Sequence, residues 1–240
     1  MYNVYKSRQS FRQTGVALII LIKGDFFMEK RIFKIFSQAD SKVALKVIPG
    51  HFVTSHSHIN YYVDLTTLQA RQNEAEAAAK LLAKMYENNT VVDTIICLNN
   101  CEIIGAYLAQ ELTKGGIMCL NAHNTIYITA PEQDINGQMI FRDNSKIMVQ
   151  GKNILILSTS ITTGVTLEKA IRSVEYYGGK VQGIASIFSF VKEAHGVMVN
   201  SIFDANDMSG YASFDEKDCP MCRTGQRIDA IVNGFGYSKL

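Results

Sequence analysis

The most informative segment of the chain spans residues 152–189 and reads KNILILSTSITTGVTLEKAIRSVEYYGGKVQGIASIFS. It opens with an unbroken apolar run at residues 154–157, which is typical of a strand buried on both faces. Apolar residues then recur at helical spacing until Gly178 and Gly179, where the pattern predicts a helix end. A second apolar run, residues 181–188, completes a strand–helix–strand unit. Such a unit requires parallel strands and a right-handed crossover, so the segment predicts an α/β fold with a central parallel sheet.

A hydroxyl-rich turn at residues 158–164 joins the first strand to the helix. At this position unpaired backbone N–H groups and the positive end of the helix dipole favour an anion. Ser160, Thr162 and Thr163 add hydroxyl donors without adding charge. A Ser/Thr turn can also do no more than cap its helix, but the whole segment predicts a phosphate-binding loop.

The segment also resembles the phosphoribosyl-diphosphate motif of type I phosphoribosyltransferases. That motif has an apolar strand, two acidic residues, one variable position, then Ile/Thr-Thr-Thr-Gly and a helix. Residues 161–164, Ile-Thr-Thr-Gly, match its end. The resemblance implies a single phosphoribosyltransferase-type domain in which the following residues hold the ribose 5′-phosphate: Ser160, Ile161, Thr162, Thr163 and Gly164.

The main departure from the motif is at its two acidic positions, which Ser158 and Thr159 occupy. These hydroxyls can still contact the ribose, but they cannot stabilise positive charge in the transition state. We therefore expect impaired catalysis, and the sequence identifies no catalytic residue.

A second resemblance lies at residues 55–64, SHSHINYYVD, which are similar to the hood segment of orotate phosphoribosyltransferases. In that family the hood covers the base-binding pocket. The resemblance implies a hood over about residues 28–65, a core over about 66–203 and a tail over about 204–240. It also implies that these side chains lie on the base side: Ser55, His56, His58, Tyr61 and Tyr62.

Two further regions depart from the orotate type. The turn at residues 99–102, where the family holds pyrophosphate, has no glycine, and Glu102 would repel an anion at the start of the next helix. No Lys or Arg occurs between Lys114 and Arg142, where the orotate enzymes place basic residues that neutralise the leaving group. We therefore expect little compensation for a pyrophosphate leaving group.

Two functions remain open after these departures. The first is an orotate-type phosphoribosyltransferase of pyrimidine nucleotide metabolism, a glycosyltransferase with a diverged substrate or slow chemistry. The second is a non-catalytic module that senses a nucleotide. In both cases the ligand is phosphoribosyl diphosphate or a nucleoside monophosphate. Phosphoribosyl diphosphate would bind together with Mg²⁺. A scaffold without a ligand would leave the hydroxyl-rich turn unexplained.

Composition describes an ordinary globular chain of 240 residues, with 47% hydrophobic and 19% charged residues. A net charge of +2 gives no basic field, so we expect no nucleic acid partner. The apolar run at residues 16–22 is too short to span a membrane, and we expect none. Five cysteines without disulfide-type spacing favour the reducing cytoplasm. We expect a homodimer.

The N-terminal 27 residues have a separate interpretation. Residues 23–27, KGDFF, can be encoded by AAA-GGA-GAT-TTT-TTT, which contains a bacterial ribosome-binding site directly before Met28. We therefore expect translation to start at Met28, with residues 1–27 a mis-annotated leader or disordered.

Histidines and cysteines raise the question of a metal. His51, His56 and His58 lie within eight positions, and His56 and His58 share a face of any extended segment. We prefer surface or hood histidines to a metal site.

Cys219 and Cys222 form a Cys-Pro-Met-Cys turn, which has the shape of a zinc knuckle. The chain has only one such pair, so Zn²⁺ would need Cys101, a histidine, or the same turn of a second subunit in a symmetric dimer. We prefer the simpler interpretation, a reduced pair whose turn docks Ile228 and Ile231 against the core.

The remaining pattern predicts the other elements. We expect a short amphipathic helix near residues 29–40, a strand at 43–48 closed by Pro49 and Gly50, and a loop at 130–137. Further expected elements are helices at residues 66–88 and 103–112, and strands at residues 93–98, 117–120 and 125–129.

Overall fold

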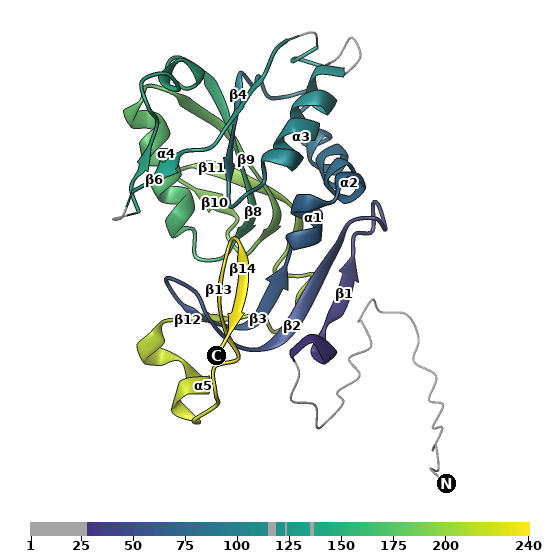
Figure 1. The fold of residues 1–240 in the computed structure, drawn as a ribbon. Helices are drawn as coiled ribbons and strands as arrows, with labels where there is room; N and C mark the ends of the chain where they lie inside the picture. Colours follow the sequence, from purple (N-terminus) through teal and green to yellow (C-terminus); the bar gives the residue numbers. More distant parts are fainter. Residues whose placement is uncertain (1–27, 115–118, 123, 135–136) are drawn as a thin grey trace.

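The computed structural model describes residues 28–114, 119–122, 124–134 and 137–240 (Figure 1). The molecule contains a parallel sheet flanked by helices and, below it in Figure 1, a second sheet, which we call the hood sheet. The predicted leader at residues 1–27 lies outside the described residues. Met28 begins a short 3-10 helix, η1 (Met28–Arg31).

The parallel sheet confirms the expected fold class. Its strands β11, β9, β8, β4 and β5 all run parallel, and β10 is antiparallel at one edge. In order across the sheet the strands are β10 (Glu193–Ala194), β11 (Val197–Asp204), β9 (Lys180–Ser189), β8 (Asn153–Ile161), β4 (Thr94–Leu98) and β5 (Tyr127–Thr129).

Helices cover both faces of this sheet because the side chains of β8 alternate between them. Leu155 and Leu157 pack in the cluster that contains helices α2 (Gln72–Ala83) and α3 (Glu102–Lys114). Ile154 and Ile156 pack in the cluster that contains α4 (Val165–Tyr176). The central strand is therefore buried on both faces, as its unbroken apolar run predicted.

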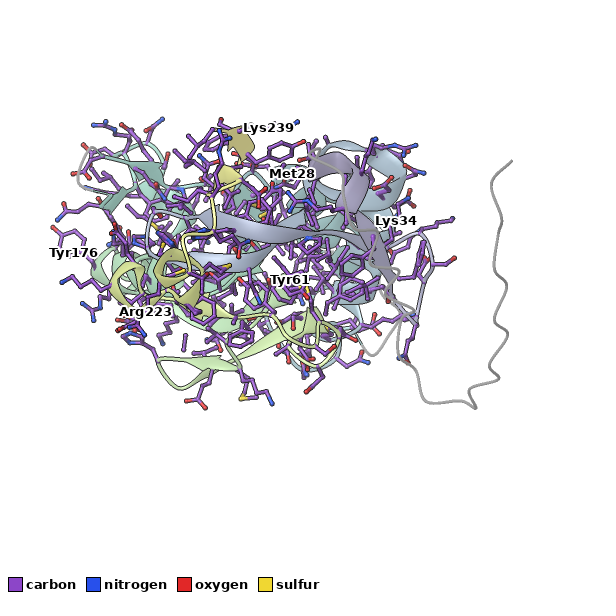
Figure 2. All side chains as sticks on the ribbon, turned by 90° about the horizontal axis from the view of Figure 1, so that it is seen from below. Met28, Lys34, Tyr61, Tyr176, Arg223 and Lys239 are labelled. Atoms are coloured by element: carbon purple, nitrogen blue, oxygen red, sulfur yellow. The ribbon has the colours of Figure 1, made fainter. Side chains whose placement is uncertain are left out.

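The hood sheet combines the N-terminal hood with the C-terminal tail. Its path is β12 (Ser213–Phe214), β3 (His58–Asp64), β2 (Ala44–Val53), β13 (Ala230–Asn233) and β14 (Gly236–Lys239), and β1 (Phe33–Phe36) also pairs with β2. Strand β13 runs parallel to β2, with Ala230 opposite Phe52. Figure 2 views the molecule from below and marks the short helix α5 (Pro220–Arg223) by Arg223, on the hood side.

The minor elements complete the chain. Helix α1 (Thr66–Ala70) connects the hood to α2, and η3 (Glu216–Asp218) precedes α5. The others are β6 (Glu132–Gln133), β7 (Met139–Ile140) and η2 (Lys146–Met148).

Several expected elements were wrong. Residues 33–36 form a strand whose side chains alternate in burial and pair with β2, so the expected helix at 29–40 is absent. Strand β2 continues through Pro49 and Gly50, with a register shift between Pro49 and Phe52. The helix expected at 66–88 breaks at Arg71, whose backbone is extended, and ends at Ala83.

Two expectations fall near the gaps in the description. Of the strand expected at residues 117–120, residues 117 and 118 lie outside the described residues, and Cys119 and Leu120 form no strand. The expected loop at 130–137 contains β6, which pairs with β7. None of the helices in the described ranges has the length and apolar run that a membrane crossing needs.

Candidate functional site

A cavity of about 830 Å³ lies at the carboxyl ends of the parallel strands, facing the hood sheet. In α/β sheets this edge is the usual place for a ligand. Segments far apart in the sequence line it, among them the hood strand β3, the β4–α3 turn, the loop after β5, the β8–α4 loop and the β13–β14 turn.

The β8–α4 loop supplies the predicted phosphate-binding residues, all of which line the cavity: Ser160, Ile161, Thr162, Thr163 and Gly164. Gly164 precedes the first residue of α4 and has a φ of 81°, a left-handed conformation that favours glycine. The N-terminus of α4 therefore opens into the cavity, where its backbone N–H groups and dipole attract an anion.

Ser158 and Thr159 lie inside β8, and each is only 2% exposed. The amide of Asn99 donates a hydrogen bond of 3.1 Å to Ser158 Oγ, which donates in turn to the backbone oxygen of Ser160. The amide of Gln69 donates to Thr159 Oγ1 at 3.4 Å. Ser158 and Thr159 occupy the two acidic positions of the phosphoribosyl-diphosphate motif. Both are thus neutral hydroxyls with neutral hydrogen-bond partners.

The β4–α3 turn has two consecutive left-handed residues, Asn99 at φ 59° and Asn100 at φ 58°. Asparagine tolerates this conformation better than most residues, and such backbone strain concentrates at functional sites. Gln69 donates a hydrogen bond of 2.6 Å to the Asn99 carbonyl, and Gly234 packs so closely on Asn99 that an added Cβ would lie 2.9 Å from its Cβ. Asn99 and Asn100 thus adopt the left-handed backbone for which a glycine would be the usual residue. Glu102, at the start of α3, also lines the cavity.

The hood wall of the cavity contains Ser55, His56, Tyr61 and Tyr62, four of the five predicted base-side residues. His58 does not line the cavity. Its side chain is buried, with Nδ1 2.9 Å from His51 Nε2, and the base-side role that the resemblance implied for the hood residues stays a prediction.

Two buried tyrosines of the cavity remain neutral. Burial raises the pKa of Tyr62 well above its usual range, and nearby Asp64 raises it further. Burial alone raises the pKa of Tyr211 in the same direction. The Tyr211 hydroxyl is buried without a hydrogen-bond partner among the described residues.

Lys169 is a lining residue that the sequence analysis missed. It is the only Lys or Arg among the described residues that line the cavity, and it comes from α4, one helical turn after Val165. Its Nζ lies beside the turn at Gly137, 3.0 Å from where a Cβ would be. Helical spacing from the loop could have found it, because the residue four positions after the helix start lies on the same face.

The β13–β14 turn, residues 233–236, is the second missed part of the site. It reaches the cavity from the C-terminal tail, and Figure 1 shows this hairpin extending from the hood towards the parallel sheet. No local pattern could have predicted this, because it depends on the pairing of β13 with β2.

The cysteines divide into two groups. Cys97, Cys101 and Cys119 are buried in or beside the core, as expected. Burial raises the pKa of the Cys101 thiol, which donates to the Leu98 and Leu157 carbonyls, so it is no partner for the tail. Outside the cavity, Cys219 and Cys222 lie with His51 and His58 in one cluster.

Comparison with known proteins identifies the family. The model of the phosphoribosyl transferase domain matches residues 64–207, which is more than half of the chain. The chain belongs to the phosphoribosyltransferase family. The match contains the β4–α3 turn and the whole β8–α4 unit, and the resemblance inferred from residues 161–164 is confirmed.

Similar phosphoribosyltransferases include orotate enzymes. An orotate phosphoribosyltransferase of Thermus thermophilus is 26% identical over 188 residues, covering 77% of this chain and 93% of the relative. The orotate phosphoribosyltransferase of Thermoanaerobacter sp. (strain X514) is 27% identical over 203 residues, covering 82% and 94%. Among solved structures, Mycobacterium tuberculosis orotate phosphoribosyltransferase is 17% identical, with a TM-score of 0.46 over 68% of this chain and 91% of the other.

Proposed function

We propose that this chain binds a ribose 5-phosphate compound, phosphoribosyl diphosphate or a nucleoside monophosphate, and transfers the phosphoribosyl group slowly or not at all. One observation carries the proposal: the β8–α4 loop opens into the cavity at a helix N-terminus, while the two preceding positions hold buried hydroxyls. Similarity to orotate phosphoribosyltransferases favours a pyrimidine nucleotide as the ligand.

The β8–α4 loop and the first turns of α4 support phosphate binding because they present three kinds of hydrogen-bond donor to the cavity. The α4 backbone N–H groups, the hydroxyls of Ser160, Thr162 and Thr163, and the Lys169 ammonium all come from lining residues. Charge-assisted hydrogen bonds from the N–H groups and hydroxyls contribute about 1.5–3 kcal/mol each, and the partly solvated charge pair of Lys169 contributes about 1 kcal/mol. The hood tyrosines, Tyr61 and Tyr62, offer aromatic surface on which a base can rest.

The lack of acids supports slow transfer. A carboxylate beside the reacting carbon stabilises its positive charge, and Ser158 and Thr159 cannot. Losing one such preorganised group costs about 3 kcal/mol of transition-state stabilisation. Glu102 is the one carboxylate among the described lining residues, so Mg²⁺ would bind chiefly through the oxygens of the diphosphate and ribose.

Ligand-induced thermal stabilisation tests the binding. We expect wild type to be stabilised by millimolar phosphoribosyl diphosphate with Mg²⁺ or by uridine monophosphate, and Gly164→Val to lose this response. Gly196→Val is the matched control, because Gly196 has a similar φ of 76° but does not line the cavity. No response in wild type would contradict the proposal.

Steady-state assays with orotate and phosphoribosyl diphosphate test the chemistry separately. We expect turnover far below the common range of about 1–10³ per second. Turnover within that range would refute slow transfer while leaving binding intact. Binding without turnover of orotate would leave two functions that fit, nucleotide sensing and transfer to a different base.

A further inference from the structure

Four side chains that can bind a metal converge on the hood, outside the cavity. They are His51 of β2, His58 of β3, and Cys219 and Cys222 at the start and within α5. Their ligand atoms all lie within 4.8 Å of one another. We propose that these four residues of a single chain bind one structural Zn²⁺.

The distances between ligand atoms fit a tetrahedral site. Zn–S bonds of about 2.3 Å and Zn–N bonds of about 2.0 Å, at tetrahedral angles, separate ligand atoms by roughly 3.3–3.8 Å. His51 Nε2 lies 3.6 Å from the sulfur of each cysteine, and Cys222 Sγ lies 3.3 Å from His58 Nδ1. The two imidazole nitrogens are 2.9 Å apart, somewhat closer than the ion requires. A small outward rotation of one ring completes the geometry.

The surroundings of His51 orient it as a ligand. Its Nδ1 lies 2.9 Å from the Gln226 carbonyl, which can only accept, so Nδ1 carries the proton and Nε2 presents its lone pair to the cluster. Metal-binding histidines usually donate their second ring N–H in this way. The His51 backbone N–H donates to Asp229, which also pairs with Arg31 at 2.5 Å.

Burial favours an ion over a set of free side chains. His51 and Cys219 are 0% exposed and His58 is 6% exposed, so three of the four polar groups have little access to water. Two thiolates and two neutral imidazoles neutralise one divalent cation, and this donor set in a tetrahedral arrangement is typical of zinc. Cys222 is exposed and provides the entry path.

The site has a structural rather than a catalytic character, because protein ligands fill all four positions. It also has a clear mechanical role. Strand β13 begins at Ala230, four residues after Gln226, and there it pairs with Phe52 of β2, the residue after His51. At the other end of β13, the turn at residues 233–236 enters the cavity. The ion therefore fixes the segment that positions one wall of the ligand cavity.

Metal analysis of the full chain, purified without chelator under reducing conditions, tests the proposal. We expect one zinc per chain in wild type, lost in Cys222→Ser and His58→Gln. His56→Gln is the matched control, because His56 lies two residues away in the same hairpin but outside the cluster, and it should retain the zinc.

A metal-free wild type would overturn the proposal. Half a zinc per chain would also overturn it, because the ion would then be shared between two chains. If the variants do not fold, Co²⁺ added to metal-depleted wild type decides. We expect the visible absorption of tetrahedral cobalt with thiolate charge-transfer bands, and a spectrum of octahedral cobalt would contradict the site.

Discussion

The β8–α4 loop and the His51–His58–Cys219–Cys222 cluster are built in opposite ways. The loop consists of consecutive residues between one strand and one helix. The cluster joins residues as far apart as His51 and Cys222, which are 171 positions from each other. The loop can therefore be located from local sequence, whereas the cluster exists only once the C-terminal tail has packed against β2 and β3.

The two regions also differ in access to solvent. The loop presents donors to an open cavity, where a ligand can enter and leave. The cluster is largely buried and provides a full set of ligands. We therefore expect changes in the cluster to affect mainly stability, and changes in the loop to affect mainly ligand affinity.

Loss of the metal should have the largest effect. In Cys222→Ser we expect the free energy of unfolding to fall by several kcal/mol, since a metal bound only by the folded state stabilises it by mass action. Thermal unfolding with and without a strong chelator measures this, with His56→Gln as control. If chelator does not change the unfolding temperature of wild type, the cluster does not stabilise the fold through a metal.

The loop should show the reverse pattern. In the double variant Thr162→Val with Thr163→Val, two hydroxyl donors are lost, and we expect ligand affinity to fall about 100-fold or more. Unfolding temperature and zinc content should not change. The matching pair Thr162→Ser with Thr163→Ser keeps the hydroxyls and should keep most of the affinity. Equal losses in both pairs would mean that the hydroxyls do not contact the ligand.

Lys169 should affect the affinities for the two ligands differently. We expect Lys169→Gln to weaken phosphoribosyl diphosphate binding about 5–10-fold, since one partly solvated charge pair contributes about 1 kcal/mol. Affinity for uridine monophosphate should change less because it lacks the diphosphate. Calorimetric titration at two salt concentrations checks this, with Lys180→Gln, outside the cavity, as control. Equal effects of the two substitutions would remove Lys169 from the site.

The smallest effect concerns Tyr211, which lines the cavity. Burial raises its pKa above the unfolded value near 10, so the stability it contributes is present below pH 10 and is lost as pH rises beyond. Tyr211→Phe should not change stability at pH 7, because the hydroxyl has no partner among the described residues. At pH 11 the variant should lose about 1 kcal/mol less than wild type. Parallel alkaline denaturation curves would contradict this.

The parallel sheet could be predicted because its strands are short apolar runs separated by helical periodicity. The β8–α4 unit shows this best, from the buried strand at Ile154 to the helix end near Gly178. The hood was harder. The apolar residues Ile32, Phe33, Ile35 and Phe36 together resemble a helical pattern, but residues 33–36 form a strand because β2 is available to pair with them.

The site followed the same division. Ser160 to Gly164 could be located from one motif, whereas the β13–β14 turn could not, because tertiary pairing places it. For Cys219 and Cys222 the sequence left Cys101, a histidine or a second subunit open as the source of further metal ligands, and it favoured a reduced pair without metal. The structure brings His51 and His58 of the same chain to them.

Isothermal titration of wild type with phosphoribosyl diphosphate and Mg²⁺ tests the central claim most directly. Several charge-assisted contacts at the β8–α4 loop predict a dissociation constant in the micromolar range, about −8 kcal/mol. Stoichiometry should be one ligand per chain, and Gly164→Val should abolish the heat of binding. Absence of binding by folded wild type at millimolar ligand would contradict the account.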